Sequence, residues 1–401
     1  MTKLEELIQE LCPDGVKYYT LNTICNVYDG THQTPQYTDS GIKFASVENI
    51  ADPYATEKYI SVSDYEKYKI KPQRNDLLMT RIGSIGVCTV IESDEPLAYY
   101  VSLALLRPDN SILNSRYLKY AIESLHCRKE LRKRTLVNAV PIKINMGDIG
   151  KITLPVPPLP VQREIVRILD NFTELTTELT AELTARKKQY EFYRDKLLDF
   201  AGNTDVKNVP LGGIAKFVYG YTDKAKETGS VRFVRITDIS EDGRLNPYDA
   251  KYVELTDESK KYLLKKGDLL LARTGATYGK TLYFEEDEPA VYASFLIKII
   301  LDNSVIKNRY YWHFSKSSLY WEQAERYVSK GGQQQFNTNA VSRVIVPIPS
   351  LEVQDRIIYV LDNFDAICTD LSSGLPAEIE ARQKQYEYYR DKLLTFREIS
   401  N

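Results

Sequence analysis

One ten-residue segment is present twice in this chain, and this repeat constrains the fold more than any other feature. QYEFYRDKLL occupies residues 189–198, and QYEYYRDKLL occupies residues 385–394. Longer matches precede both copies, since LPVQREIVRILDNF (159–172) resembles LEVQDRIIYVLDNF (351–364). The stretches between them match more faintly, as NDLLMTRIGSIG matches GDLLLARTGATYG. A repeat of this extent predicts two equivalent globular halves, each followed by a long helix.

The globular halves are predicted to mix helices and strands. Residues 115–134 and 308–328 have helical periodicity, whereas β-branched runs such as GVCTVIE and KITLPV are typical of strands. Proline clusters at 155–160 and 347–350 end each half. The amphipathic segment 3–11 precedes the first half as the end of the first long helix precedes the second. The repeat is therefore predicted to be circularly permuted, with the two chain ends close together.

The predicted fold class is α+β. Two mixed α/β domains are expected at 1–158 and 203–350, and the spacer helices that follow them at 159–202 and 351–401. Apolar residues in these helices recur at steps of three and four, as in a heptad seam. The seam predicts a coiled coil of two antiparallel helices with approximate two-fold symmetry, although two surface helices that each cap their own domain also fit the pattern.

The two spacer helices differ in length by one tetrad. Three tandem tetrads, TELT, TELT and AELT, fill residues 173–184 of the first helix. The second has four more residues between Phe364 and Tyr386 than the first has between Phe172 and Tyr190, which nearly preserves the apolar face. Pro376 either kinks the second helix or starts a new one. The predicted helix-pairing residues are Leu175, Leu179, Leu183, Tyr190, Tyr193, Leu197, Leu371, Leu375, Ile379, Tyr386, Tyr389 and Leu393.

Composition excludes some protein classes. With 53 basic and 55 acidic residues, the chain is not coated with phosphate-binding charge, although local basic patches remain open. The five cysteines form no C-x-x-C pair, which favours reduced thiols. The first residues carry acids where a signal peptide is apolar, and no apolar run is long enough to span a membrane. These features predict a cytoplasmic protein.

From Met1 to Phe396 the chain resembles the specificity (S) subunit of type I restriction-modification systems. The resemblance rests on the VQ…LDNF start of each spacer helix, the ELT tetrads, the paired decapeptides, and DGTHQTP at 29–35. It implies two target recognition domains, each reading one half of an asymmetric bipartite double-stranded DNA site, with the helices setting the gap between the halves. It also implies that two modification (M) subunits dock on the helices, so that two identical partners explain two near-identical decapeptides.

The resemblance further implies a chain without catalysis or cofactor of its own. The modification subunits would use S-adenosylmethionine to methylate adenine, and restriction (R) subunits would use ATP and Mg²⁺ to translocate and cleave DNA. The sequence has no [DN]-P-P-[YF] motif for methyl transfer, because ADPYA (51–55) and LNPYD (245–249) each lack the second proline. GATYGKT (275–281) is one residue too short for a phosphate-binding loop. Three scattered histidines predict no metal site.

Candidate DNA-binding residues lie in a basic helical segment and in several loops. Residues 116–143 carry eight basic and two acidic side chains, which favours phosphate contact over a merely solvated helix face. The loops combine glycines, which permit close backbone approach, with amides suited to base edges. For the two arginines that precede such glycines, a purely structural role is equally open. The candidates are Thr31, His32, Gln33, Thr34, Arg81, Ser84, Arg128, Arg132, Arg134, Lys143, Arg273, Thr277, Lys280, Gln333, Gln334 and Gln335.

Two other functions compete with the non-catalytic specificity subunit. A self-sufficient nuclease or methyltransferase would need catalytic motifs that the sequence lacks. A coiled-coil DNA-binding adaptor or regulator would act without methyltransferase partners.

Overall fold

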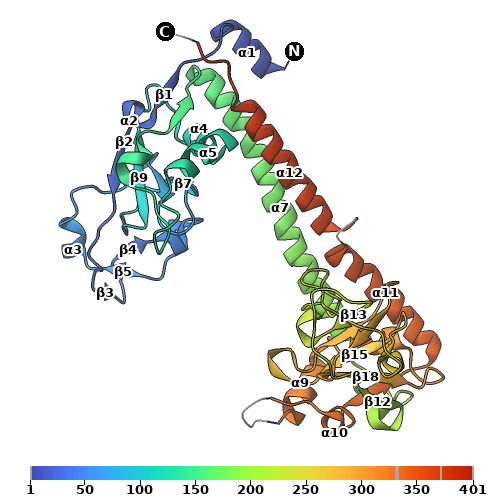
Figure 1. Ribbon diagram of the computed structural model, residues 1–401. Helices are drawn as coiled ribbons and strands as arrows, with labels where there is room; N and C mark the ends of the chain where they lie inside the picture. Colours follow the sequence, from blue (N-terminus) through green and yellow to red (C-terminus); the bar gives the residue numbers. More distant parts are fainter. Residues whose placement is uncertain (1, 330–333, 371–372, 400–401) are drawn as a thin grey trace. The chain divides into compact units, whose positions relative to one another are not determined.

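The computed structural model describes residues 2–329, 334–370 and 373–399 and divides the chain into two compact units (Figure 1). Unit 1 comprises Met1–Leu179 and Ile379–Asn401, and unit 2 comprises Thr180–Glu378. Each unit holds one globular lobe, which we call the first lobe (residues 12–158) and the second lobe (residues 203–350). Each also contains one part of the 40-residue helix α7 (Leu159–Leu198). The predicted α+β class with two mixed lobes and long helices is confirmed.

The first lobe is built on a four-stranded antiparallel sheet in the order β2-β9-β6-β7. A second sheet has the order β3-β5-β4-β8, and its strands β4 and β8 are parallel. The central strand β6 is buried on both faces, because Leu77 packs toward helix α4 and Leu78 toward the second sheet. The strands are β1 (Tyr18–Thr20), β2 (Cys25–Asp29), β3 (Tyr37–Thr38), β4 (Ile42–Ala45), β5 (Tyr59–Ile60), β6 (Leu77–Thr80), β7 (Cys88–Val90), β8 (Leu97–Tyr99), β9 (Leu103–Pro108) and β10 (Thr153–Pro155). The helices of unit 1 before α7 are α1 (Lys3–Leu11), α2 (Leu21–Ile24), α3 (Val62–Glu66), α4 (Ser115–Glu123), α5 (Leu125–Arg134) and α6 (Met146–Ile149).

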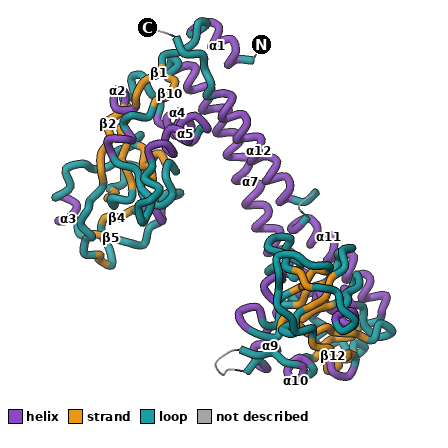
Figure 2. The backbone as a smooth tube through the Cα atoms, viewed as in Figure 1, coloured by secondary structure: helices purple, strands orange, loops and turns teal. Residues whose placement is uncertain are grey.

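The second lobe repeats this topology (Figure 2). Its main sheet has the order β12-β18-β15-β16, and a smaller sheet, β14-β13-β17, contains the parallel pair β13 and β17. Strands β11 and β19 pair as β1 and β10 do in the first lobe. The strands are β11 (Lys207–Pro210), β12 (Ala215–Tyr219), β13 (Val231–Val234), β14 (Tyr252–Val253), β15 (Leu269–Ala272), β16 (Thr281–Tyr283), β17 (Ala290–Tyr292), β18 (Leu296–Leu301) and β19 (Ile345–Ile348). The helices are α8 (Asn308–Phe314), α9 (Ser318–Tyr327) and α10 (Thr338–Val341).

A buried glutamine fastens each lobe to the helix that follows it. Gln162 Nε2 donates hydrogen bonds of 2.7 Å to the carbonyls of Ile112 and Pro157. Gln354 Nε2 makes the same two bonds in the second lobe, to Val305 and Pro349. The glutamine of each repeated VQ pair therefore occupies the same structural position in both halves.

The two ends of the described chain lie together in unit 1, as expected for a circularly permuted repeat (Figure 1). The Val16 amide donates to the Arg397 carbonyl at 2.8 Å, and the Ile399 amide donates back to Val16 at 3.1 Å.

The second spacer segment is two helices rather than one. Helix α11 spans Leu351–Thr369, and α12 spans Leu375–Leu393. Pro376 lies in the first turn of α12, where its missing N–H leaves no helical bond unmade, so it starts a new helix.

Helix α7 contacts α12 in unit 1 and α11 in unit 2. Phe172 stacks on Tyr389 with ring centroids 5.4 Å apart, and Tyr193 stacks on Phe364 at 5.7 Å. In both units these pairs join the phenylalanine of LDNF to the tyrosine at the fifth position of the decapeptide. The earlier residues of α7 therefore contact α12, the later of its two partner helices in the chain, and its later residues contact α11. The contacts thus follow the order of an antiparallel pairing.

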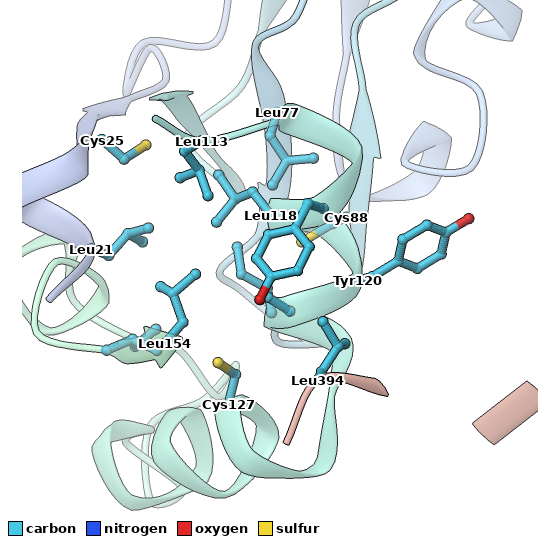
Figure 3. Close-up of a cluster of buried hydrophobic side chains, with 14 of the residues drawn as sticks. Leu21, Cys25, Leu77, Cys88, Leu113, Leu118, Tyr120, Cys127, Leu154 and Leu394 are labelled. Carbon is cyan, nitrogen blue, oxygen red and sulfur yellow. The ribbon is translucent and has the colours of Figure 1, made fainter. Parts of the chain in front are cut away.

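Each decapeptide also packs on the lobe of its own unit. The last leucine of each copy, Leu198 or Leu394, is buried in a lobe core. Figure 3 shows Leu394 in the same cluster as Leu118 of α4 and Cys127 of α5. The first tyrosine of each copy lies against a ring of its lobe: Tyr386 against Tyr120, with ring centroids 6.4 Å apart, and Tyr190 against His313, at 6.5 Å. The packing of each decapeptide on a lobe of the same chain therefore explains part of its repetition.

The predicted seam residues do not all have the same surroundings. Tyr389 and Tyr193 make helix-to-helix ring stacks, whereas Tyr386 and Leu393 pack on the first-lobe core, and Tyr190, Leu183 and Leu197 pack on the core that joins the second lobe to α11. Leu175, Leu179, Leu375 and Ile379 are half-buried on the helices. Leu371 lies outside the described residues.

Three threonines of the tetrad segment of α7 make side-chain hydrogen bonds within the helix. The hydroxyls of Thr176, Thr177 and Thr184 each donate to the carbonyl four residues earlier, at 2.9–3.0 Å. The glutamates between them are exposed. Threonine is tolerated inside this helix because its hydroxyl is satisfied locally.

Candidate nucleic-acid interface

Four loops of the first lobe meet at one end of its main sheet. They are the segment after β2 (30–36), the β6–β7 loop (81–87), the β8–β9 turn (100–102) and the segment after α5 (135–145). Four backbone hydrogen bonds join them: Val101 N to Thr31 O at 3.0 Å, Arg81 N to Ser102 O at 3.0 Å, Gly83 N to Ile142 O at 2.9 Å, and Ile144 N to Arg81 O at 3.0 Å. We call this surface the first loop edge. Three of its four segments contain DNA-binding candidates from the sequence.

The second lobe forms an equivalent second loop edge. Its described segments are 220–230, 273–280, 293–295 and 334–337. Their backbone bonds repeat those of the first edge: Ser294 N to Tyr221 O at 2.8 Å, Arg273 N to Phe295 O at 3.1 Å, Phe336 N to Arg273 O at 2.7 Å, and Gly275 N to Gln334 O at 3.3 Å. The scaffold is shared, whereas the exposed side chains differ.

A glycine makes this convergence possible in each lobe. A Cβ on Gly30 would lie 2.4 Å from the Tyr100 carbonyl oxygen, and one on Gly220 would lie 2.3 Å from that of Ala293. No side chain fits at either position, so the chain can pass close to the neighbouring turn only with glycine there.

Arg81 holds the first loop edge together. Its guanidinium donates to Asp29 Oδ1 at 2.8 Å, to the Val101 carbonyl at 3.1 Å and to the Ile144 carbonyl at 3.3 Å. The side chain is buried. Arg81 is thus placed to position the loops, which is the structural role that the sequence left open, and the exposed residues around it are better placed for DNA.

Asp29, the ion-pair partner of Arg81, also contacts His32. Its second carboxylate oxygen lies 2.9 Å from His32 Nε2, and its first accepts the Gly30 amide at 3.0 Å. The imidazole is exposed, as are Gln33 and Thr34, while Thr31 is half-buried. A carboxylate bonded to one ring nitrogen fixes the orientation of an imidazole. The DGTHQTP turn therefore presents an oriented ring beside two free polar side chains.

The basic segment is less positive than its composition suggests. Arg134 and Lys133 pair with Glu130 at 2.6 and 3.0 Å, and hydrogen bonds from these two cations hold the Glu130 pKa below its ordinary value. Arg116 pairs with Glu92 and Asp170. Within the described residues, Arg128, Lys129, Arg132 and Lys143 are exposed and have no ion pair.

Helix α5 ends beside the first loop edge. A Cβ on Gly86 would lie 2.6 Å from Leu131 Cδ1, and the Leu136 amide donates to the Lys143 carbonyl at 2.7 Å. The unpaired cations of α5 therefore lie close to the loops that carry the polar candidates, an arrangement suited to phosphate contact beside base contact.

The remaining candidates fall on or near the two edges. Ser84, Gln334 and Gln335 are exposed, and Arg273, Thr277 and Lys280 are half-buried. Gln333 lies outside the described residues. The assignment of individual residues to DNA remains a prediction.

Sequence reasoning missed two kinds of residue. Tyr219 and Phe295 are exposed aromatics at the second loop edge, in stretches that looked like ordinary strand sequence. Asp195 and Asp391, from the two decapeptides, each reach a helix of the adjoining lobe. Asp391 Oδ1 accepts the Leu125 amide of α5 at 2.8 Å, and Asp195 Oδ1 accepts the Ser318 amide of α9 at 3.3 Å. The identity of the RD pair in both copies was the available signal.

Some features of the described residues bear on metal binding, membrane spanning and thiol chemistry. These residues contain no group of three metal-ligating side chains and no helix long and apolar enough to cross a bilayer. The GATYGKT segment forms a tight turn packed on Trp321, and its Gly279 carbonyl accepts the Tyr320 hydroxyl at 2.8 Å. All five cysteines are buried and unpaired, and burial raises the pKa of the Cys25 thiol to about 12.

Comparison with known proteins assigns the family. The family model described as the type I restriction modification DNA specificity domain matches residues 13–186 and again 203–381. The chain therefore belongs to the type I restriction-modification DNA specificity family.

Curated relatives carry corresponding names. A Haemophilus influenzae protein named as a type I restriction enzyme specificity subunit is 33% identical over 299 residues, 71% of this chain and 73% of that protein. The specificity subunit of an Escherichia coli type I restriction enzyme is 33% identical over 258 residues, covering 61% of this chain and 63% of the relative.

Solved structures support the fold. A chain from a study of type I restriction-modification complex assembly aligns with a TM-score of 0.64 at 15% identity, covering 96% of this chain and 98% of that one. The S subunit of Mycoplasma genitalium aligns with a TM-score of 0.53, also at 15% identity, covering 98% and 99%.

Proposed function

We propose that this chain is the DNA sequence-specificity subunit of a type I restriction-modification complex and that it reads a bipartite, asymmetric DNA site. The observation that carries the proposal is the pair of loop edges, which share backbone bonds but not exposed side chains. Equivalent scaffolds with different surfaces suit two readers of two different half-sites. Family membership supports the same function.

The first loop edge offers both kinds of contact that a DNA reader needs. The α5 cations can neutralise phosphates, which supplies affinity without sequence preference. His32, Gln33 and Thr34 can make hydrogen bonds to base edges, which supplies specificity. The second edge offers Gln334 and Gln335, whose side-chain amides can make two hydrogen bonds to N6 and N7 of adenine in the major groove.

Two modification subunits would dock on the outward faces of the decapeptides. Phe192 is 61% exposed and Tyr388, its counterpart, is 62% exposed. A lysine ammonium lies over each ring, Lys196 at 5.9 Å and Lys392 at 5.8 Å from the centroid. Two matching aromatic–lysine surfaces suit two copies of one partner. The inward faces of the same decapeptides hold the lobes.

Catalysis would belong to the partners. S-adenosylmethionine would bind the modification subunits, and ATP with Mg²⁺ the restriction subunits, while this chain would supply no catalytic group or cofactor. The assembly would work in the cytoplasm, where its DNA target is found.

The test is an exchange of residues 205–348 for the corresponding segment of a relative. The variant is expressed with its modification subunits, and methylated adenine is mapped genome-wide. We expect one half of the recognised site to change and the other half and the gap to stay the same. A change in both halves contradicts independent readers. Unaltered methylation after deletion of the gene contradicts a specificity subunit and favours an adaptor that acts without methyltransferase partners.

A further inference from the structure

The second loop edge carries an aromatic platform that the first lacks. Tyr219 at the end of β12 is 41% exposed, and Phe295 in the β17–β18 turn is 49% exposed. The Arg273 guanidinium lies over both rings, 5.2 Å from the Tyr219 centroid and 5.5 Å from that of Phe295. We define these three residues as the platform.

The platform is held in place by the loop edge itself. Arg273 Nε donates to the Ser294 carbonyl at 3.1 Å, which fixes the guanidinium beside the turn. The Tyr219 hydroxyl lies 3.2 Å from Thr338 Oγ1 at the start of α10. The rings are therefore presented by short, bonded segments, and contact with a ligand costs little side-chain entropy.

The equivalent positions of the first lobe carry no aromatic ring. The strand registers align Tyr219 with Asp29 and Phe295 with Ser102. Asp29 forms an ion pair with the arginine, and the Ser102 hydroxyl accepts the Val47 amide at 3.1 Å. The arginine of this position therefore contacts polar groups in the first lobe, where it is Arg81, and exposed rings in the second, where it is Arg273.

We infer that the platform stacks on a nucleobase at an opened step of the half-site read by the second lobe, with Phe295 as the wedge; this inference rests on the proposed function. An exposed phenylalanine on a tight turn suits insertion beside a base, because apolar side chains that enter a base step unstack it. The rings offer a flat π surface to a base, which is tolerant of sequence. The guanidinium supplies positive charge where the phosphates pass.

Charge and position favour DNA over a protein partner as the occupant. The same edge exposes the amides of Gln334 and Gln335, and the Gln334 carbonyl accepts the Gly275 amide next to the platform arginine. Polar amides and a cation around two rings make a surface suited to bases and phosphates. A protein-binding patch would be expected to extend apolar contact beyond two rings.

The experiment uses the full chain with its modification subunits and a duplex that carries the mapped site. 2-Aminopurine replaces each purine of the second half-site in turn, and binding and fluorescence are measured for the wild type, Phe295→Ala and Tyr219→Phe. Tyr248→Ala is the matched control, because Tyr248 is a 78% exposed aromatic of the same lobe outside the loop edge. Unstacking relieves the quenching of 2-aminopurine, so its fluorescence reports an opened step.

We expect a fluorescence rise at one position with the wild type and with Tyr248→Ala. Phe295→Ala should abolish the rise and weaken binding roughly tenfold, while Tyr219→Phe, which keeps the ring, should retain both. Loss of affinity should disappear when the second half-site is scrambled. If Phe295→Ala matches the wild type on a duplex that the complex still methylates, the platform inference fails and the proposed function stands. If wild-type complex recognises no bipartite site, the proposed function itself fails. Weakened partner binding with normal DNA binding by Phe295→Ala would assign the platform to a protein and overturn the inference.

Discussion

The two decapeptides end in leucines that are buried in different units, which allows a matched pair of variants. Leu198 lies in the core shared by the second lobe, α7 and α11, and Leu394 in the core of unit 1. Both tryptophans of the chain, Trp312 and Trp321, belong to the second lobe. Tryptophan fluorescence therefore reports the unfolding of unit 2 alone.

Leu198→Ala should lower the free energy of unfolding of unit 2 by about 3 kcal/mol, because it removes a fully buried leucine and leaves a cavity. With a urea dependence of about 2 kcal/mol per molar, the tryptophan-monitored midpoint should fall by roughly 1.5 M. Leu394→Ala should leave that midpoint in place and lower a separate transition followed by circular dichroism. If Leu394→Ala shifts the tryptophan midpoint as far as Leu198→Ala does, the two units unfold as one and the reasoning is wrong.

Three further predictions concern the first loop edge, the tetrads and a buried histidine. Asp29→Ala removes the ion-pair partner of the Arg81 guanidinium, so we expect the free energy of unfolding to fall by about 1–2 kcal/mol. Recognition of the first half-site only should also weaken, as measured by binding to duplexes with one half scrambled. Asp39→Ala, which changes an exposed residue nearby, is the control. Inserting one AELT tetrad after Leu183 adds about 6 Å of helix and should lengthen the gap in the methylated site without altering either half. An unchanged gap would contradict the prediction that the helices set its length. Burial lowers the pKa of His313 from 6.5 to about 4, so the unfolded chain binds a proton first as the pH falls. The free energy of unfolding of unit 2 should therefore fall by about 2 kcal/mol between pH 7 and pH 5. His313→Gln should remove most of that pH dependence in urea titrations followed by tryptophan fluorescence.

Repeats made most of the fold predictable from the sequence. The repeated motifs align the two lobes, and the apolar runs Leu77–Thr80 and Leu269–Ala272 appear as the buried central strands. The break between α11 and α12 was visible only as an ambiguity at Pro376, because proline is compatible with both a kink and a first turn.

The side chains at the loop edges were harder to predict. Arg81 and Arg273 stand in similar sequences, yet one is buried by Asp29 and the other lies against Tyr219 and Phe295. These neighbours lie 20 or more residues away in the chain, so local pattern carries no information about them. From the sequence, Arg116 was likewise predicted to be a free cation, whereas in the structure it forms ion pairs with Glu92 and Asp170.

Some of the contacts that hold each lobe to the helices are made to main-chain atoms, beside the side-chain ion pairs and the packed leucines. Asp391 and Asp195 accept backbone amides of α5 and α9, and Gln162 and Gln354 donate to backbone carbonyls. Main-chain groups are common to every sequence that adopts the same path. A different lobe that follows the same backbone path would therefore keep these particular contacts, whatever its side chains at those positions.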